Sequence, residues 1–232
     1  MGAVDGSVNL NKLIEDYKIK NYVETGTGRC ESLIKTFSYD LKRYGIELDE
    51  RLYEQTVAQL GNYVSMFKGY TKDVMHDVLT VLDDSPTLFW LDAHYPGSDY
   101  FGQPYDSVQD KELRAPLELE LKEILSARDI SNDVLLMDDL RMYVDRPFQH
   151  GNWFLREPEN NYDFVNDLIG TTHTITEHMA HEGYIICLPI SVQTTISCIK
   201  PQPFVNEMFT VGAGGIRIQE PSKEVFKIIP GA

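Results

Sequence analysis

Three aspartates follow two apolar runs of this sequence and could together hold a metal ion. The run Thr87–Asp92 ends in an aspartate, and the run Asp133–Met137 is followed by Asp138 and Asp139. If the two runs are adjacent strands of a parallel sheet, their carboxyl ends bring the three side chains together. Clustered carboxylates repel one another, so they favour a hard divalent cation such as Mg²⁺ or Mn²⁺. The alternative is structural: Asp138 hydrogen-bonds the end of the sheet and Asp139 begins the loop.

His94 lies two residues beyond Asp92 and is the candidate catalytic base on chemical grounds. The unperturbed pKa of histidine is about 6.5, which suits an imidazole to accept a proton at neutral pH. We interpret four other histidines as loop or surface residues rather than catalytic groups: His150, His173, His178 and His181.

A glycine turn follows the first apolar strand. Gly26 and Gly28 lie between a strand expected at about 20–25 and a helix whose apolar positions are 30, 33, 34 and 37. Because glycine lets the backbone turn sharply and approach a ligand, we expect a ligand on this turn. A dinucleotide site would need a glycine at position 31, but Glu31 would repel a diphosphate, which disfavours NAD and FAD. The residues alone also allow a turn that serves packing only.

Glu47 ends the next expected strand, at about 43–48. In Rossmann-like nucleotide sites, an acidic residue one helix and one strand after the glycine turn holds the two hydroxyls of a ribose. We therefore predict that Glu47 binds a ribose. The alternative is a solvated glutamate beside Asp49 and Glu50.

The expected elements position these groups at one edge of a sheet. Strands are expected at about 20–25, 43–48, 63–67, 87–92 and 133–137, with amphipathic helices between them. This alternation predicts a doubly wound, Rossmann-like α/β fold with a mostly parallel sheet and ligands outside the strand ends. The segments 183–188 and 195–199 are expected to end the sheet as a C-terminal antiparallel hairpin. Ser7 and Thr71 are expected to cap the helices that follow them.

The composition fits one domain, because 232 residues of which 42% are hydrophobic can bury a sizeable core. We expect a single domain, 1–232, with a core at about 8–200 and an extension at 201–232. A formal charge of −15 disfavours nucleic acids and anionic membranes as partners. The sequence has no run of ~20 apolar residues and no signal-peptide pattern, and its three cysteines suggest neither disulfides nor a zinc site. A cytoplasmic protein is therefore expected.

The segment 95–111 is a long expected loop with four aromatic residues: Tyr95, Tyr100, Phe101 and Tyr105. Long loops in compact domains are commonly lids or binding loops, and aromatic rings beside polar groups suit a sugar or another ring-shaped ligand. The alternative is a loop that packs these rings against itself.

Several of these segments resemble a known enzyme family. The pattern E-x-G-x-G-x-C at residues 24–30 resembles motif I of the class I S-adenosylmethionine-dependent methyltransferases, with Cys30 in place of the third glycine. The segments Leu88–Tyr95, Ala115–Leu121 and Leu136–Arg141 resemble, in this order, motifs of sugar and glycan O-methyltransferases of bacteria and large viruses. The resemblance covers about residues 8–200.

This resemblance implies roles for individual residues. The residues that would bind S-adenosylmethionine are Glu24, Gly26, Thr27, Gly28, Glu47, Tyr70 and Asp92. Tyr70 would meet the adenine, where the family often has an acidic residue. A matching Asp and Asp-Asp pair holds a metal in the family, which implies that role for Asp92, Asp138 and Asp139. Asp92 would also be the catalytic base, in place of His94.

Together these observations predict an enzyme that transfers the methyl group of S-adenosylmethionine to a hydroxyl of a glycan or glycoside, assisted by Mg²⁺ or Mn²⁺. An alcohol holds its proton tightly at neutral pH, so such a site needs a base, a metal ion or both. Two alternatives stay open: a methyltransferase for small catechol-like or amine acceptors, and a non-catalytic module that binds a nucleotide or a glycan.

Overall fold

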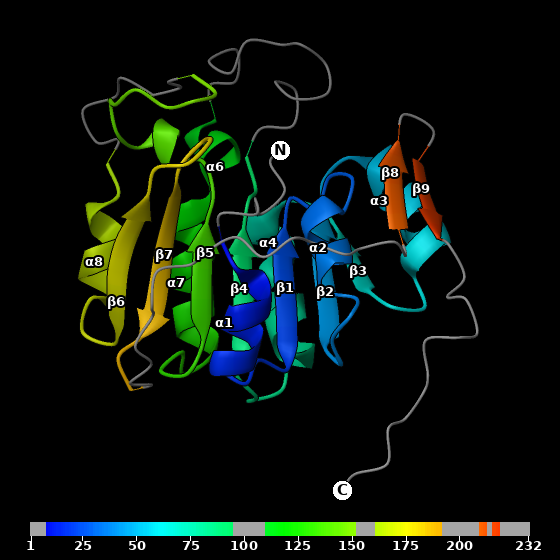
Figure 1. Ribbon diagram of the computed structural model, residues 1–232, viewed down its shortest axis with the longest axis horizontal. Coiled ribbons are helices and arrows are strands. Elements are labelled where there is room, and N and C mark those ends of the chain that lie inside the picture. Colours follow the sequence, from blue (N-terminus) through cyan, green and yellow to red (C-terminus); the bar gives the residue numbers. More distant parts are fainter. Residues whose placement is uncertain (1–7, 95–109, 152–160, 192–208, 213–214, 219–232) are drawn as a thin grey trace, which may run out of the picture.

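In the computed structural model, the short apolar runs form the strands of a sheet, and amphipathic helices cover both of its faces (Figure 1). The structure describes residues 8–94, 110–151, 161–191, 209–212 and 215–218. The strands of the main sheet are β1 (Asn21–Thr25), β2 (Lys42–Glu47), β3 (Ser65–Lys68), β4 (Thr87–Leu91), β5 (Val134–Met137), β6 (His173–His178) and β7 (Tyr184–Pro189). The helices are α1 (Leu10–Asp16), α2 (Glu31–Lys35), α3 (Glu50–Leu60), α4 (Thr71–Val81), α6 (Lys111–Arg114), α7 (Leu117–Ala127), the 3-10 helix η2 (Leu140–Met142) and α8 (Asp163–Ile169).

Seven strands form the main sheet in the order β3-β2-β1-β4-β5-β7-β6. The strands from β3 to β5 are parallel, whereas β7 runs antiparallel to both β5 and β6. β4 and β5 are neighbours, with Leu91 opposite Met137, so the residues that follow these two strands emerge side by side. The predicted α/β fold with a mostly parallel sheet and an antiparallel hairpin is confirmed.

The central strands are apolar on both faces because helices cover both faces. All residues of β1, β4 and β5 are buried. Phe89 of β4 packs with residues of α4, α7 and α8 on one face, and Trp90 packs with residues of α1 and α2 on the other. In Figure 1, α1 lies in front of the sheet and α4 and α7 lie behind it. This rigid sheet positions the turns that follow its strands.

The second strand of the antiparallel hairpin differs from the sequence prediction. β7 covers the expected segment 183–188, but it pairs with the preceding strand β6. The segment 195–199 lies outside the described residues. His173, expected in a loop or at the surface, begins β6 and is buried, with Nε2 at 3.0 Å from the backbone oxygen of Asp133. β6 is an edge strand with mostly polar residues, so it lacks the apolar run that identifies the central strands.

Two predicted helix caps are also wrong. The N-cap of α1 is Asn9, whose side chain accepts a hydrogen bond from the N–H of Lys12, whereas the expected cap Ser7 lies outside the described residues. Thr71 is the first residue of α4, and Tyr70 holds the cap position without a side-chain hydrogen bond. Thr71 is buried, and its side chain hydrogen-bonds Glu120 of α7.

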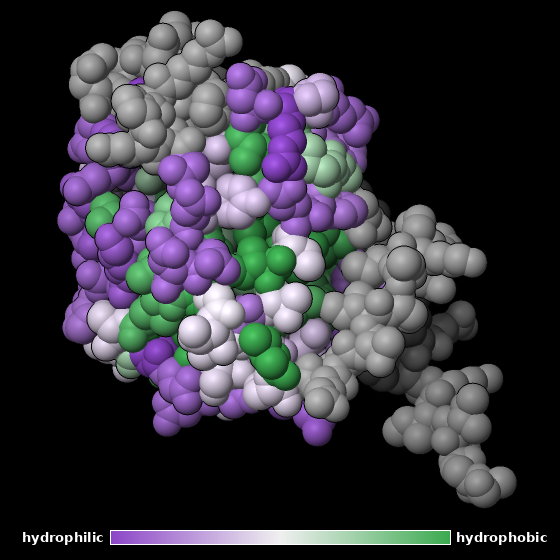
Figure 2. Space-filling view, turned by 90° about the vertical axis from the view of Figure 1, so that its left-hand side faces the viewer, coloured by the Kyte–Doolittle hydropathy of each residue, from purple (hydrophilic) through white to green (hydrophobic). Residues whose placement is uncertain are grey.

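The expected extension contains a separate two-stranded sheet of β8 (Phe209–Gly212) and β9 (Gly215–Ile218). The division into core and extension stays a prediction. Figure 2 views the side of the main sheet that ends in β6 and α8, where hydrophilic residues alternate with smaller hydrophobic areas. Within the described ranges, no helix combines the length and the apolar character needed to cross a bilayer.

Candidate active site

The ends of β4 and β5 bring together Asp92, Asp138 and Asp139, which we call the acidic cluster. The N–H of Asp138 donates to the backbone oxygen of Leu91 at 3.0 Å and joins the two strand ends. Asp139 has a left-handed backbone with φ of 55°, and the Nε of Arg141 donates to its Oδ1 at 2.8 Å. All three aspartates are buried. The sheet therefore gathers the three acids at one edge, as the strand pattern predicts.

The buried acids have oxygens that lack a partner. Burial raises the pKa of Asp92 and of Asp138 well above the ordinary value of 3.8. The charges of Asp138 and Asp139 raise the pKa of Asp92 further, and the charge of Asp139 raises that of Asp138. Within the described residues, Asp92 Oδ1 and Asp138 Oδ2 are buried without a hydrogen-bond partner. Asp138 Oδ1 has the structural role considered above, because it accepts from the N–H of Asp139 at 2.8 Å. Its second oxygen and that of Asp92 still need a proton or a cation, which fits a hard metal ion.

His94 directs Nδ1 toward oxygen atoms of the acidic cluster. This nitrogen lies 3.1 Å from the backbone oxygen of Asp92, 3.8 Å from Asp92 Oδ1 and 3.5 Å from Asp139 Oδ2. Ligand atoms of the three residues lie within 4.8 Å of one another, close enough to share an ion. Two roles fit this geometry. With its proton on Nδ1, His94 has a basic Nε2; with a lone pair on Nδ1, it is a metal ligand.

The glycine turn reaches the same edge because β1 pairs with β4. The hydroxyl of Thr25 accepts hydrogen bonds from the N–H groups of Asp92 and Ala93 at 3.1 and 3.3 Å. Gly26 has φ of +66°, and a Cβ there would lie 2.7 Å from the backbone oxygen of Asp92. Glycine is therefore required at position 26 both for its backbone conformation and for the close approach of the two strand ends.

Glu47 is buried at the end of β2, which contradicts the alternative of a solvated glutamate. Its Oε2 accepts from the N–H of Gly28 at 2.7 Å, and its Oε1 accepts from the N–H of Asp49 at 2.8 Å. Burial raises the pKa of Glu47, and these backbone hydrogen bonds act in the opposite direction. The carboxylate is thus held in a fixed position and retains lone pairs for a ligand hydroxyl.

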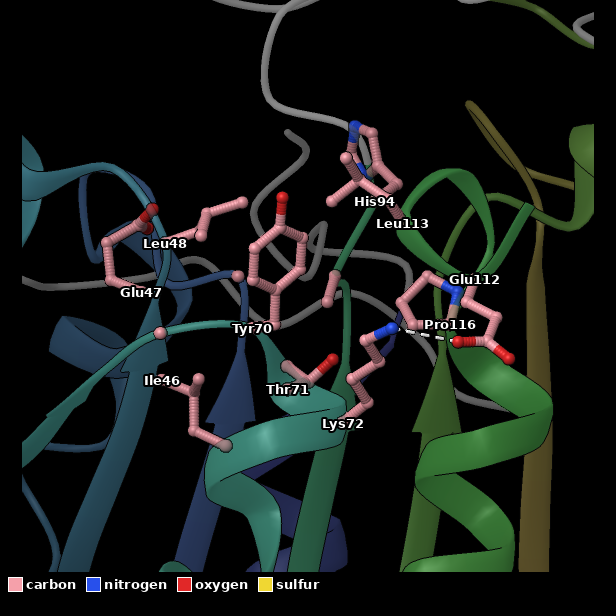
Figure 3. Close-up of a pocket in the computed structure, with 13 residues that line it drawn as sticks. Ile46, Glu47, Leu48, Tyr70, Thr71, Lys72, His94, Glu112, Leu113 and Pro116 are labelled. Atoms are coloured by element: carbon pink, nitrogen blue, oxygen red, sulfur yellow. Dashed lines mark hydrogen bonds and ion pairs between the residues drawn. The ribbon is translucent and has the colours of Figure 1, made fainter. Parts of the chain in front are cut away.

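A crevice of about 460 Å³, partly open to solvent, lies at the ends of β1 to β4 (Figure 3). Tyr70 stands in the middle of it, between Glu47 and His94. Gly26, Glu47 and Tyr70 line the crevice, as expected of residues that bind a cofactor.

Two charged residues of the crevice do not stand out in the sequence. Lys72 of α4 and Glu112 of α6 form an ion pair at 2.9 Å across one wall, as Figure 3 shows. Both side chains are partly exposed, so the pair stabilises the fold little. Charged residues are common on protein surfaces, and these two lie far apart in the sequence. Only the packing of α4 and α6 brings them together at the crevice.

Glu120 of α7 is a buried carboxylate that the sequence analysis missed. Burial raises its pKa from 4.5 to about 7, although the hydroxyls of Thr71 and Thr25 act to lower it. Its Oε1 has no hydrogen-bond partner among the described residues. Glu120 lines a cavity that is partly open to solvent, together with the acidic cluster. The sequence could have indicated its burial, because Glu120 lies three residues after Leu117 and therefore on the apolar face of α7.

Among the other predicted cofactor residues, Asp92 lines the cavity of the acidic cluster, whereas Glu24, Thr27 and Gly28 line neither the crevice nor this cavity. Glu24 is buried and accepts a hydrogen bond from the hydroxyl of Tyr22 at 3.0 Å, and burial raises its pKa to about 8. Thr27 and Gly28 both contact Glu47: Thr27 Oγ1 lies 3.4 Å from Glu47 Oε2, and Gly28 donates its N–H to the same oxygen. The aromatic residues of the expected binding loop lie outside the described residues: Tyr95, Tyr100, Phe101 and Tyr105.

Neither a model of a known protein family nor a curated protein matches this sequence. Solved structures match its fold. A Staphylococcus aureus protein, assigned provisionally as a caffeoyl-CoA O-methyltransferase, superposes with a TM-score of 0.52 and 16% identity over 78% of this chain and 80% of its own. An O-methyltransferase from Bacillus cereus, solved in complex with SAH, has a TM-score of 0.51 and 14% identity over 82% of each chain. The chain therefore has the α/β fold of the class I methyltransferases.

Proposed function

We propose that this chain is an O-methyltransferase that moves the methyl group of S-adenosylmethionine to a sugar hydroxyl of a glycan or glycoside, with a divalent cation at the acidic cluster. One observation carries the proposal: the crevice and the cavity of the acidic cluster share Ala93 and His94 in their linings. A cofactor on the glycine turn and a hydroxyl at the acidic cluster would therefore lie next to each other, as methyl transfer requires.

The side of the site formed by β1, β2 and β3 suits S-adenosylmethionine. Glu47 is fixed by two backbone N–H groups and can accept hydrogen bonds from the ribose hydroxyls. Tyr70 offers an aromatic ring beside Glu47 for the adenine. The complex of the Bacillus cereus neighbour with SAH supports the same cofactor here.

The acidic cluster suits Mg²⁺ or Mn²⁺. Asp92, Asp138 and Asp139 would hold the ion, because hard cations take carboxylate oxygens and two of these oxygens are buried without a partner in the described residues. When bound, such an ion orients oxygen atoms and lowers the pKa of a hydroxyl.

The proton of the acceptor hydroxyl would go to His94 or Asp92. Carbonyl and carboxylate oxygens around Nδ1 of His94 favour the tautomer with its proton on that nitrogen, which makes Nε2 the accepting atom. The carboxylates of Asp92 and Asp139 would stabilise the imidazolium. As the hydroxyl loses its proton, its oxygen attacks the methyl carbon in line with the sulfur. The bond between methyl carbon and sulfur breaks, and S-adenosylhomocysteine leaves as a neutral thioether.

A sugar fits the site as acceptor because it is neutral and can present two adjacent oxygens to one ion. The formal charge of −15 disfavours nucleic acids and anionic membranes as partners. A catechol also presents two adjacent oxygens, and the description of the Staphylococcus aureus neighbour makes catechols the second candidate acceptor.

Methyl transfer from radiolabelled S-adenosylmethionine to a panel of glycosides, catechols and amines tests the proposal, each with Mg²⁺ and with EDTA. We expect labelled glycosides only with Mg²⁺. If only catechols are labelled, the acceptor is a catechol and not a sugar. If only amines are labelled, the proposal of O-methylation is wrong.

Calorimetry with S-adenosylhomocysteine and with NAD tests the cofactor separately from the acceptor. We expect S-adenosylhomocysteine to bind and NAD not to bind. Binding of NAD alone would overturn the proposal. Binding of S-adenosylhomocysteine without label in any acceptor would favour a non-catalytic module.

A further inference from the structure

A second group of potential metal ligands lies outside the acidic cluster, where the segment after η2 meets the turn between β6 and β7. It consists of His150, His181 and Glu182, which we call the histidine cluster. Each residue offers a ligand atom within 4.8 Å of the others. The proposed methyl transfer uses none of these residues.

The separation of the two imidazole nitrogens in the histidine cluster matches that of two ligands of one zinc ion, and Glu182 lies at hydrogen-bond distance from the other nitrogen of His150. His150 Nε2 lies 3.4 Å from His181 Nδ1, and His150 Nδ1 lies 2.7 Å from Glu182 Oε1. Two nitrogens that bind one tetrahedral zinc ion, each at about 2.0–2.1 Å, are roughly 3.4 Å apart. The two rings are inclined at 63° with centroids 4.9 Å apart.

The backbone holds these side chains together. The N–H of Arg141 donates to the oxygen of Glu182 at 3.0 Å, and the N–H of His150 donates to the oxygen of His181 at 3.4 Å. His181 has φ of 55°, a conformation that is uncommon for residues other than glycine. The fold therefore maintains a locally unfavourable backbone at a residue whose ring nitrogen faces His150.

We propose that the histidine cluster is a second metal site, selective for a borderline first-row transition ion such as Zn²⁺. Two imidazoles and one carboxylate suit zinc, whereas Mg²⁺ prefers a site of oxygen atoms alone. Glu182 either binds the ion or accepts a hydrogen bond from His150 Nδ1 and so orients that ring, and both are roles of the same site. The side chain of His150 is 45% exposed, which leaves room for a water ligand.

An ion at the histidine cluster would also stabilise the acidic cluster, because Arg141 connects the two. Nη1 of Arg141 donates to the backbone oxygen of His150 at 2.9 Å, and its Nε donates to Asp139 Oδ1 at 2.8 Å. Arg141 is buried. Zinc would fasten the His150 segment to the turn before β7 and thereby hold Arg141 against Asp139.

Calorimetry on the metal-free full chain tests this site, with Asp92→Asn as the background that weakens the acidic cluster and its group with His94. We expect one zinc ion per chain, undiminished by excess Mg²⁺. His150→Ala and His181→Ala should each weaken zinc binding at least ~100-fold. His76→Ala, which removes an exposed histidine of α4, is the matched control and should bind zinc as the background does.

Two further measurements keep the test decisive if a histidine variant folds poorly. Co²⁺ added to the chain with both histidines should give the absorption spectrum of a four-coordinate ion, and zinc should slow amide exchange at Arg141. Zinc binding that survives both histidine substitutions in folded variants, or no zinc binding at all, would overturn the proposal. The three residues would then be a hydrogen-bonded group only.

Discussion

Two carboxylate-bearing regions lie on either side of His94, and they differ in how their oxygens are satisfied. Glu47 has each oxygen hydrogen-bonded to a backbone N–H, whereas Asp92 and Asp138 each have a buried oxygen without a partner in the described part of the chain. A satisfied carboxylate is held in place and can accept further hydrogen bonds from a neutral ligand. A group of unsatisfied carboxylates needs a proton or a cation. This difference is the reason why the proposed function places the organic cofactor at Glu47 and the metal ion at the acidic cluster.

His94 lies between the two regions, so removing its imidazole should have the largest effect on turnover. We expect His94→Ala to lower kcat by ~10²–10⁴-fold, because the acceptor hydroxyl would lose its general base. Steady-state methyl transfer under saturating Mg²⁺ measures this effect. His76→Ala, on the exposed side of α4, is the control.

Cation affinity distinguishes the two roles that the geometry allows for His94. An unchanged affinity for Mn²⁺ in His94→Ala identifies the residue as a base, whereas a weakened affinity identifies it as a ligand. A variant with normal kcat would move the role of base to Asp92.

Asp138→Asn should weaken cation binding at the acidic cluster and leave cofactor binding at Glu47 unchanged. We expect at least ~100-fold weaker binding of Mn²⁺, because the amide removes a charge from a buried oxygen cluster, and a parallel loss of turnover. Calorimetry with Mn²⁺ and with S-adenosylhomocysteine measures the affinity of the variant for the cation and for the cofactor product. Asp84→Asn, at an exposed position, is the control. Full turnover in EDTA together with an active Asp138→Asn variant would assign the acids a structural role only.

Glu47→Gln should weaken cofactor binding and leave cation binding at the acidic cluster unchanged. We expect a loss of about 1–3 kcal/mol in the binding free energy of S-adenosylhomocysteine, because the ribose would lose a charged hydrogen-bond acceptor. Glu50→Gln, three residues further on at the start of α3, removes an exposed carboxylate and serves as the control. Equal affinities of Glu47→Gln and the unmodified chain would mean that the ribose does not bind at Glu47.

The sequence predicts the central sheet and the side chains at its strand ends, but not the groups that helix packing brings together. Asp92 and Asp138 follow continuous apolar runs, so their common edge follows from strand order alone. The polar edge strand β6 has no such run, and its pairing with β7 emerges only in the folded chain. Whether Lys72 meets Glu112 depends on how α4 and α6 pack, which residue spacing does not encode.

The sequence places Glu120 on the apolar face of α7, but only tertiary packing shows which groups surround it. This residue leads to the prediction with the smallest effect. Burial raises its pKa from 4.5 to about 7, so between these values folding takes up a proton. The stability that this group contributes is fully present below about pH 4.5 and is lost as the pH rises through about 7. Glu120→Gln keeps the shape of the side chain and cannot ionise, so it should remove this part of the pH dependence.

Urea unfolding of the unmodified chain and of Glu120→Gln in EDTA measures this contribution. Between about pH 6 and about pH 7.5, the variant should gain roughly 1 kcal/mol of unfolding free energy relative to the unmodified chain. Both proteins lose stability over this range, because burial also raises the pKa of Glu24 to about 8. Only the difference between the two proteins therefore reports on Glu120. A difference that stays constant with pH would mean that the hydroxyls of Thr25 and Thr71 suffice to keep Glu120 charged in the fold, and that it resembles Glu47 rather than the acidic cluster.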